Sequence, residues 1–384
     1  MNKVRLGIVG LGNMGAMHAH SIRAGNISRL ELAAVCDGNA AKLSPFADLP
    51  GFTAADALIA SGVVDAVLIA TPHYSHTTIG IAALAAGLHV LIEKPLSVHK
   101  ADCERLIAAH QDKRQVFAAM FNQRTDPTFR KIRTLLQEGG LGEIRRINWV
   151  ITNWFRTGAY YASGGWRATW AGEGGGVLLN QSPHNLDLLQ WMFGLPVRVR
   201  AFCHFGRYHD IEVEDDVTAY LEFANGATGV FITSTGEAPG TNRLEITAES
   251  GRVVYEHDEL HVTRNAVPMS EFSRTSAQAF AQPDNLDTCM PASDHGGQHN
   301  EVLQNFADAI LEGRPLIAPA VEGIRSVELA NAMLLSTWLD RTMEMPIDGT
   351  RFARLLRQHI RKSRVKKRIV TSAAAENFAK SFNR

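Results

Sequence analysis

The stretch Val4-Arg5-Leu6-Gly7-Ile8-Val9-Gly10-Leu11-Gly12-Asn13-Met14-Gly15 decides the fold. Its first half is a short apolar run typical of a buried strand, and its second half has the spacing G-x-G-x-x-G. A stretch with helical character follows to about Ala24. In this arrangement the first glycine permits a tight turn, the second admits a pyrophosphate close to the backbone, and the third lets helix and strand pack closely. The segment therefore predicts a dinucleotide site whose phosphates meet a helix N-terminus.

The next predicted strand, Leu30–Cys36, is followed directly by Asp37. Asp37 lies 22 residues after Gly15, close to the spacing at which a carboxylate binds the hydroxyls of an adenosine ribose. A carboxylate in this place also repels a 2′-phosphate, and the following Gly38-Asn39 provides no cation to receive one. The sequence therefore predicts NAD as the cofactor and makes NADP a poorer fit.

Strands and helices continue to alternate through the first third of the chain. The apolar runs 64–70, 89–92 and 116–121 have the composition of buried strands. Helical stretches at 76–86 and 100–111 separate them, and Gly87 marks the end of the first. Repeated βα units predict an α/β domain with a doubly wound parallel sheet of the Rossmann type. We expect this domain to occupy residues 1–123.

The tripeptide Glu93-Lys94-Pro95 follows the predicted strand 89–92 directly. Ligands of open α/β sheets bind at the carboxyl ends of the strands, so the amine of Lys94 is presented where a ligand binds. Pro95 disfavours a helical backbone at Lys94 and keeps that residue extended. Taken alone, a lysine at the end of a strand is most often solvated, but the dinucleotide motif upstream favours a functional role.

The alternation stops near residues 122–127, and a different pattern follows. After a predicted helix at 128–139, strand-like runs occur at 144–153, 197–205, 216–223, 226–235, 242–248 and 251–255. Their density predicts an α+β domain at residues 124–350 with a large, mostly antiparallel open sheet. A sheet with one uncovered face needs a partner, so we expect a homodimer or homotetramer. A basic extension at residues 351–384 ends the chain.

The glycine run Gly174-Gly175-Gly176 precedes a stretch that contains Asn180, His184 and Asp187. These three residues lie along one face if the stretch is helical. An imidazole beside a carboxylate permits general acid–base catalysis, so His184 is a candidate base and Asp187 a candidate partner. Asp187 equally suits a structural role in bonding backbone amides.

Aromatic and arginine side chains are interleaved on a glycine-rich segment at residues 154–170. Aromatic rings stack on the apolar face of a sugar, and arginine donates to its hydroxyl oxygens. The same pattern also suits a loop that its tryptophans anchor. The candidate carbohydrate contacts are Tyr160, Trp166, Arg167 and, further along the chain, His299.

Several of these motifs occur together in one known family. Gly10 to Gly15, Asp37, Thr71-Pro72, His76, Gly87, Glu93-Lys94-Pro95 and Asn122-x-Arg124 resemble the glucose–fructose oxidoreductase, inositol dehydrogenase and rhizopine-catabolism (Gfo/Idh/MocA) family. The resemblance runs from residue 3 to about residue 347. It implies an oxidoreductase that transfers hydride between a secondary alcohol of a sugar, glycoside or cyclitol and a nicotinamide.

The resemblance also implies roles for individual residues. Lys94 would polarise the reacting oxygen, and His184 would act as the general base. Asn180 departs from the family pattern, because inositol dehydrogenases carry an aspartate there, so the basicity of His184 would depend more on Asp187. The expected cofactor-binding residues are Gly10, Gly12, Asn13, Met14, Gly15, Asp37, Thr71, Pro72, His76, Glu93, Lys94 and Asn122. The expected substrate-binding residues are Lys94, Arg124, Tyr160, Trp166, Arg167, Asn180, His184 and His299.

Composition narrows the class of protein further. The 384 residues carry no formal net charge, which argues against electrostatic binding of nucleic acid by the whole protein. The four cysteines, Cys36, Cys103, Cys203 and Cys289, lack metal or disulfide spacing, and the paired histidines lack a third ligand, so no metal site is predicted. A strand that starts near Met1 and the lack of an apolar run of about 18 residues predict a cytoplasmic protein without membrane association.

Three alternatives stay open. Some relatives in the family retain NAD and cleave a glycosidic bond through transient oxidation, and others are sugar-sensing regulators without chemistry. The presence of both Lys94 and His184 argues against a regulator. The third alternative is a nucleic-acid partner of the tail, because residues 351–384 carry eleven Lys and Arg against one acid, Glu376. We expect instead a solvated, partly helical extension that could pack on a neighbouring subunit.

Overall fold

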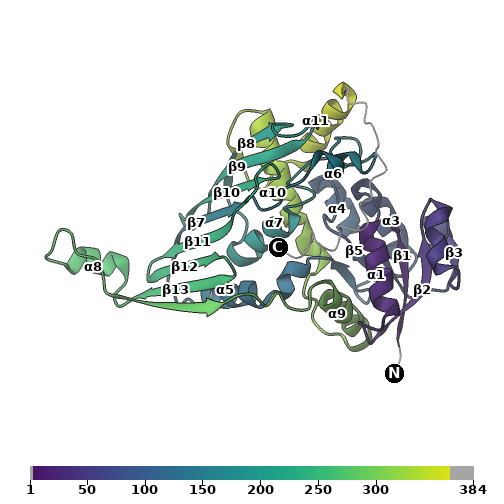
Figure 1. Cartoon of the computed structure of the whole chain (residues 1–384), viewed down its shortest axis with the longest axis horizontal. Helices are drawn as coiled ribbons and strands as arrows, with labels where there is room; N and C mark the ends of the chain where they lie inside the picture. Colours follow the sequence, from purple (N-terminus) through teal and green to yellow (C-terminus); the bar gives the residue numbers. More distant parts are fainter. Residues whose placement is uncertain (1–2, 364–384) are drawn as a thin grey trace.

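The first sheet of the protein is parallel and has six strands. The computed structural model describes residues 3–363, and its amino-terminal sheet has the strand order β3-β2-β1-β4-β5-β6 (Figure 1). Each of these pairings is parallel. The chain runs from β1 to one edge and then back past β1 to the other, which is the Rossmann order. The strands are β1 (Val4–Val9), β2 (Leu30–Cys36), β3 (Gly51–Phe52), β4 (Ala66–Ile69), β5 (His89–Ile92) and β6 (Phe117–Ala119).

Helices cover both faces of this sheet, which confirms the predicted doubly wound architecture. One face packs on α1 and on α9, a helix from far along the chain that brings Val302 and Phe306 into the same core as Ile8. The other face packs on α3 and α4, which contribute Leu84 and Leu106. The helices of this half are α1 (Asn13–Arg23), η1 (Ala40–Phe46), α2 (Ala55–Ile59), α3 (His73–Ala85), α4 (Lys100–Ala108) and α9 (Gln298–Glu312).

The second sheet has nine strands in the order β14-β13-β12-β11-β7-β10-β9-β8-β15. Only β7 and β10 pair in parallel among the described strands of this sheet, and the other pairings are antiparallel. The predicted large, mostly antiparallel sheet is therefore confirmed. Its strands are β7 (Ile144–Ile151), β8 (Arg198–Phe205), β9 (Glu214–Glu222), β10 (Thr228–Ser234), β11 (Asn242–Ala248), β12 (Gly251–Glu256), β13 (Glu259–Asn265), β14 (Asn285–Pro291) and β15 (Met343–Glu344).

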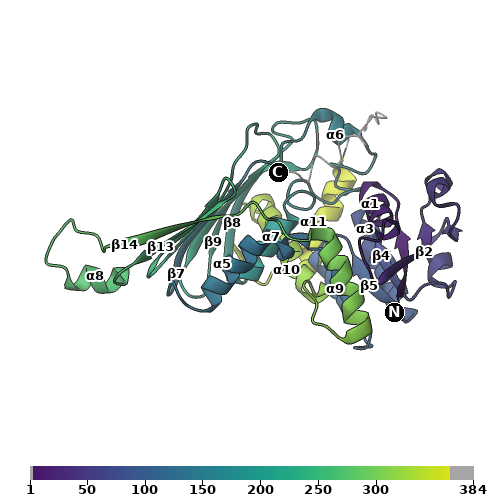
Figure 2. The same ribbon diagram turned by 60° about the horizontal axis from the view of Figure 1, so that its bottom comes forward.

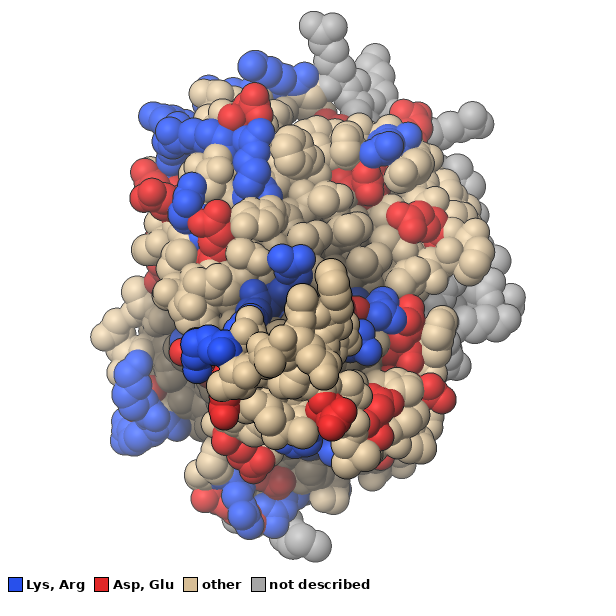
Figure 3. Space-filling view, turned by 90° about the vertical axis from the view of Figure 1, so that its left-hand side faces the viewer, with Lys and Arg blue, Asp and Glu red and all other residues tan. Residues whose placement is uncertain are grey.

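Within residues 3–363, helices cover only one face of the second sheet (Figure 2). Alternate strand residues such as Ile147 and Trp149 enter the core beneath these helices. On the opposite face Phe202 and Tyr220 are 54% and 43% exposed. Charges of both signs are interspersed among uncharged side chains at this end of the molecule (Figure 3). The helices of this half are η2 (Asn122–Thr125), α5 (Pro127–Gln137), α6 (Gly158–Ala162), α7 (Pro183–Phe193), α8 (Met269–Thr275), α10 (Ala320–Trp338) and α11 (Gly349–Lys362).

The last described helix, α11, packs on the rest of the chain. Phe352 is buried and stacks on Trp338 of α10 with ring centroids 5.2 Å apart. A domain border at residue 350 would fall inside the first turn of α11, and α9 belongs to the core of the first sheet, so the three predicted domain limits stay a prediction. The predicted basic extension is described only to residue 363, and residues 364–384 lie outside the described part. Within residues 3–363, no helix combines the length and the apolar character that crossing a membrane requires.

Candidate active site

The loop between β1 and α1 has glycines where the chain packs closely on its neighbours and where a ligand could approach the backbone. Gly10 has a φ of +95°, and a Cβ there would lie 2.7 Å from a carbonyl oxygen of the loop after β4. A Cβ at Gly15 would lie 1.8 Å from the carbonyl oxygen of Gly10, so only glycine lets α1 pack this closely on β1. At Gly12 a Cβ would meet no described atom within 4 Å, which leaves this flank open to a ligand. Asn13 and Met14 begin α1, and no side chain caps the described helix at this end.

Asp37 follows β2 and faces the same loop. Its carboxylate accepts hydrogen bonds from the backbone N–H of Leu11, at 2.8 Å, and of Asn39, at 2.9 Å. Lys42 lies 3.2 Å from one of its oxygens, because η1 folds back toward Asp37. The sequence showed no cation directly after Asp37, and the local turn that supplies one was not predicted.

His76 ties together the loops after β4 and β5. Its two ring nitrogens lie 2.9 Å from the carbonyl oxygens of Thr71 and Pro95, and its ring is fully buried. Burial lowers the pKa of His76 against the opposing effect of the two carbonyl groups. The structure thus gives His76 a role in positioning these loops in place of the predicted direct contact with a cofactor. Unlike the ring nitrogens of His76, the buried Oγ1 of Thr71 has no hydrogen-bond partner among the described residues. Pro72, the next residue, directly precedes α3.

Glu93 stands behind Lys94 and connects β5 to α1. Its buried carboxylate lies 2.7 Å from Nε2 of His18. Burial would raise the pKa of Glu93, but the hydrogen bond with His18 and nearby positive charge lower it to about 2. Glu93 is therefore an ionised carboxylate that faces the protein interior.

Lys94 reaches across to the second half of the molecule. Its Nζ donates a hydrogen bond to the backbone carbonyl oxygen of Asn180 at 2.7 Å. Burial lowers the pKa of Lys94 to about 8, with Glu93 and Glu173 acting to raise it and two neighbouring guanidinium groups acting to lower it. An amine of this pKa can lose or gain a proton close to neutral pH.

His184 stands in the first turn of α7, which begins at Pro183. Its side chain is 9% exposed and meets the ring of Phe121 edge-on at a centroid distance of 6.3 Å. Its Nδ1 is buried and has no hydrogen-bond partner among the described residues. Burial, with the charges of Lys94 and His299, holds the pKa of His184 well below its ordinary value of 6.5. The imidazole is therefore neutral at neutral pH, so one of its two nitrogens carries no proton.

The predicted helical face of Asn180, His184 and Asp187 does not form. Asn180 lies in the turns before α7 rather than on the helix. Asp187 is 1% exposed, and its two oxygens each lie 2.7 Å from a guanidinium nitrogen of Arg124. Arg124 is equally buried and also contacts Glu322 at 2.5 Å. Two expectations are corrected: Asp187 is committed to Arg124 rather than to His184, and Arg124 is engaged in an internal ion-pair cluster rather than presented to a substrate.

Glu173 is a site residue that the sequence did not single out. It is 1% exposed, and one of its oxygens accepts a hydrogen bond from Nδ2 of Asn180. The other oxygen accepts from the backbone N–H of Ala168 at 2.6 Å, and its carbonyl oxygen lies 3.1 Å from Nδ1 of His73. A buried carboxylate therefore lies one hydrogen bond from the position at which the expected aspartate is missing. The available signal was an acidic residue directly before the run 174–176.

The predicted aromatic and arginine contacts gather near the amine of Lys94. The guanidinium carbon of Arg167 lies 4.7 Å from the ring centroid of Tyr160 and 4.8 Å from that of Trp166. Arg167 also donates to the hydroxyl of Tyr160 at 2.8 Å. Arg156 lies 5.2 Å from the ring centroid of Tyr160, and the charges of both arginines act on Lys94. The two arginines whose charges act on Lys94 are therefore packed on aromatic rings.

Helix α9 brings residues from late in the chain to the same place. The rings of His299 and His18 have centroids 5.6 Å apart, and burial lowers the pKa of His299 to about 4. Nδ2 of Asn122 donates to Gln298 at 2.5 Å. This leaves the buried Oδ1 of Asn122 without a hydrogen-bond partner among the described residues. An oxygen in this state suits a ligand with an N–H donor, such as the carboxamide of a nicotinamide.

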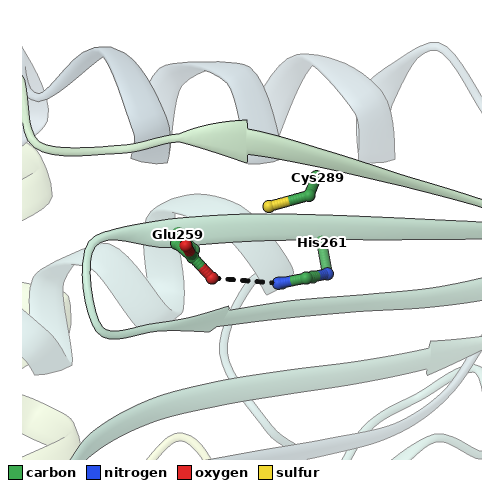
Figure 4. Close-up of side chains that lie close together, drawn as sticks. All are labelled: Glu259, His261 and Cys289. Carbon is green, nitrogen blue, oxygen red and sulfur yellow. Dashed lines mark hydrogen bonds and ion pairs between the residues drawn. The ribbon is translucent and has the colours of Figure 1, made fainter.

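A separate cluster of Glu259, His261 and Cys289 lies on β13 and β14, with ligand atoms within 4.8 Å of one another (Figure 4). His261 is already paired with Asp287 at 3.1 Å and with Glu259 at 3.3 Å. The hydrogen bond with Asp287, together with that of Glu259, raises the pKa of His261, which favours the protonated ring and opposes metal binding. This cluster is remote from the site in the sheet order, and the expectation of no metal site stays a prediction.

The fold and the site together define an oxidoreductase that binds a dinucleotide. The glycine loop, the acid that follows β2, and the oxygens of Thr71 and Asn122, which lack partners among the described residues, fit that class of cofactor. The family described as "Oxidoreductase family, NAD-binding Rossmann fold" matches residues 4–121, and the "GFO/IDH/MocA C-terminal domain" matches residues 129–254. The two matches span more than half of the chain. The protein belongs to the Gfo/Idh/MocA family of oxidoreductases, and the predicted family, fold and NAD-binding class are confirmed.

Relatives in this family match the chain over most of its length. Myo-inositol 2-dehydrogenase of Thermotoga maritima is 28% identical over 262 residues, which cover 65% of this chain and 74% of that protein. UDP-N-acetylglucosamine 3-dehydrogenase of Acidithiobacillus ferrooxidans is 27% identical over 339 residues, covering 86% of this chain and 96% of that protein. The structure of the WlbA dehydrogenase of Chromobacterium violaceum, in complex with NADH and UDP-GlcNAcA, matches with a TM-score of 0.78 at 26% identity. That match covers 91% of this chain and 97% of the other.

Proposed function

We propose that the protein is an NAD-dependent dehydrogenase that oxidises a secondary alcohol of a sugar, glycoside or cyclitol, with Lys94 and His184 as its catalytic residues. One observation carries the proposal. The amine of Lys94, with a pKa of about 8, acts electrostatically on the imidazole of His184, whose Nδ1 has no hydrogen-bond partner among the described residues. The relatives named for inositol and UDP-sugar oxidation support the substrate class.

The two residues have complementary tasks in such a reaction. When bound, NAD supplies the acceptor for the hydride that leaves the alcohol carbon. The ammonium of Lys94 donates a hydrogen bond to the substrate oxygen and stabilises the negative charge that develops there. His184 accepts the hydroxyl proton at its basic nitrogen and returns it in the reverse direction. Low exposure around both groups strengthens these electrostatic effects.

The residues that would hold the cofactor follow from the same arrangement. The backbone of Gly10, Gly12 and Gly15 and the first amides of α1 would hold the pyrophosphate. Asp37 would bind the ribose hydroxyls, which favours NAD over NADP. Lys42 at 3.2 Å compensates part of the charge of Asp37, so we expect this preference to be moderate rather than absolute.

The proposal for the substrate rests on the side of the site that Arg156 and Arg167 line. These two cations lie over the ring of Tyr160, and Arg167 also lies over Trp166. Such a surface binds a polyhydroxylated ring through its apolar face and its hydroxyl oxygens, and it suits an additional anionic group. His299 and Asn180 complete the expected contacts.

The test of the function is a screen for NADH formation. Purified protein is incubated with NAD and separate panels of inositols, free sugars, glycosides and nucleotide sugars, and absorbance of NADH is followed. We expect turnover with at least one cyclic polyol or sugar. A protein that binds NAD and produces no NADH with any panel would contradict the proposal. Cofactor that stays bound through purification while a glycosidic bond is cleaved would favour the transient-oxidation alternative.

We also propose that the open faces of the second sheet pair in a homodimer or homotetramer, and that the protein works in the cytoplasm. The exposed Phe202 and Tyr220 support the pairing, because large apolar side chains are favoured at subunit interfaces. Light scattering tests this proposal, and a monomer at micromolar concentration would contradict it.

A further inference from the structure

Glu173 has a place in the site that the proposed roles of Lys94 and His184 do not explain. We propose that Glu173 is a positioning residue, which fixes the amide of Asn180 toward the substrate and supplies the negative charge that keeps Lys94 protonated. This inference rests on the proposed dehydrogenase function and deepens it. Glu173 would provide the negative charge that relatives with an aspartate at position 180 have at that position.

The geometry determines which way the amide of Asn180 points. A carboxylate only accepts hydrogen bonds, so Glu173 must face the NH2 end of the amide. The Oδ1 of Asn180 is thereby directed away from Glu173. The backbone carbonyl oxygen of the same residue accepts the hydrogen bond from Lys94 at 2.7 Å. Asn180 therefore connects Glu173 and Lys94 through two different groups, and a change at Glu173 reaches Lys94 through one residue.

This orientation has a consequence for the substrate. A fixed Oδ1 is a neutral acceptor, so it favours a substrate group that donates a hydrogen bond, such as a hydroxyl beside the reacting carbon. An ether oxygen or a CH2 group in this place has no proton to donate and would leave Oδ1 unpaired. A site that leaves a polar group unpaired discriminates strongly against the analogue that lacks the partner. We therefore expect a free hydroxyl next to the oxidised carbon to be required.

Because few negative charges surround Lys94, the protonation of its amine depends strongly on Glu173. Two carboxylates, Glu93 and Glu173, act to raise the pKa of Lys94, and Arg156 and Arg167 act to lower it. The histidines that face Lys94, namely His73, His76, His184 and His299, each have a lowered pKa and are neutral at neutral pH. Glu93 is also bound to His18. Removal of the charge of Glu173 therefore leaves two cations opposed by a single carboxylate that is already paired.

A charge exchange between positions 173 and 180 tests the inference. Glu173→Gln should lower kcat about tenfold and move the alkaline limb of its pH profile down by about one pH unit, because Lys94 loses its proton earlier. Asn180→Asp should place two carboxylates in contact, raise the pKa of one of them and disturb the profile in the opposite sense. The double variant Glu173→Gln/Asn180→Asp restores one carboxylate bonded to one amide. It should recover kcat to within about threefold of the parent.

A matched control is available in Glu214→Gln. Glu214 is also a buried glutamate bound to the glycine segment, since it accepts from the N–H of Gly176 at 2.7 Å and of Leu178 at 3.1 Å. It is not among the charges that act on Lys94. Its replacement should leave the pH profile of kcat unchanged. A Glu173→Gln variant with the parental profile, or a double variant no better than Glu173→Gln, would overturn the inference.

A second measurement tests the inference without relying on turnover, and it still applies if one variant does not fold. The rate at which acetic anhydride labels the amine of Lys94, followed by mass spectrometry across pH, gives the pKa of that amine directly. Glu173→Gln should lower this pKa and the double variant should restore it. If Glu173→Gln does not fold, Asn180→Asp alone must raise the pKa for the inference to stand. A parent protein that forms no NADH contradicts the proposed function, whereas unchanged labelling in folded variants contradicts the role of Glu173.

Discussion

Lys94 and His184 stand in the same site, yet the protein surrounds them differently. Two carboxylates, Glu93 and Glu173, act on Lys94, and its amine donates a hydrogen bond to the carbonyl oxygen of Asn180. His184 has an unpartnered Nδ1 among the described residues and no carboxylate bonded to it, because Asp187 belongs to Arg124. In the proposed mechanism, the supporting negative charge is therefore concentrated at the lysine. This difference predicts that changes on the lysine side cost more than changes on the histidine side.

Removal of the Lys94 amine should have the largest effect. Lys94→Ala takes away the group that polarises the substrate oxygen, and we expect turnover to fall by about 1,000- to 10,000-fold, at the upper end for positioned acid–base catalysis. Steady-state NADH formation measures the loss, and calorimetric titration should show that the variant still binds NAD. Retention of wild-type turnover would exclude Lys94 from the chemistry.

Removal of the imidazole should cost less. We expect His184→Ala to lower turnover by about 100-fold, because water can reach the vacated space and take the proton in part. The low pKa of His184 also predicts that the parent enzyme keeps its activity as the pH falls through 6.5. A pH profile of kcat/KM checks this point. An acid limb near 6.5 that disappears in His184→Ala would show that the histidine is more basic than its surroundings imply.

The buried pair of Arg124 and Asp187 should affect stability and leave the titration of His184 alone. Arg124→Met leaves the carboxylate of Asp187 buried without its partner, and we expect a loss of about 3 kcal/mol in the free energy of unfolding. Urea denaturation measures it. The double variant Arg124→Met/Asp187→Leu should recover most of the stability, since both charges are gone. A shift of the His184 limb in Asp187→Asn would show that the two residues are coupled after all.

The smallest expected effect concerns Glu214, a buried carboxyl without a cation. Burial raises the pKa of Glu214 to about 7, above its unfolded value of 4.5. A raised carboxyl pKa favours the folded state below pH 4.5, and this contribution is lost as the pH rises to 7. Glu214→Gln should therefore gain stability relative to the parent as the pH rises from 4.5 through 7, with the full difference reached above pH 7. Thermal unfolding at several pH values measures this dependence.

Local patterns allowed the prediction of the first sheet almost strand by strand. The predicted strands 4–9, 30–36 and 89–92 match β1, β2 and β5 in both bounds. Glycine spacing, apolar runs and a terminal acid are signals that lie close together in the chain. The contribution of α9 was not predicted, because nothing local shows that Val302 and Phe306 pack on a sheet that starts near residue 4. β13 and β14 were also missed, because β14 is largely exposed and lacks apolar alternation.

The sequence predicted which residues form the candidate site better than it predicted which of them contact one another. The motifs located Lys94 and His184. The helical spacing of Asn180, His184 and Asp187 placed Asp187 beside His184, whereas the structure bonds Asp187 to Arg124. The helix begins only at Pro183, and the turns before it bring Glu173 to Asn180 instead. Asp187 was available to Arg124 because residues 63 positions apart in the chain meet in the core. Long-range ion pairs of this kind leave no mark in a single sequence.

Helix α9 has a consequence for the way the protein is made. Its residues Val302 and Phe306 complete the core of the first sheet, and Gln298 contacts Asn122 beside the proposed nicotinamide site. During synthesis the ribosome releases the glycine loop long before it releases α9. A nascent chain that ends before α9 would therefore expose the part of that face that α1 does not cover, and its proposed dinucleotide site would be incomplete. The proposed dinucleotide site is therefore completed only after α9, which ends at Glu312, has been synthesised.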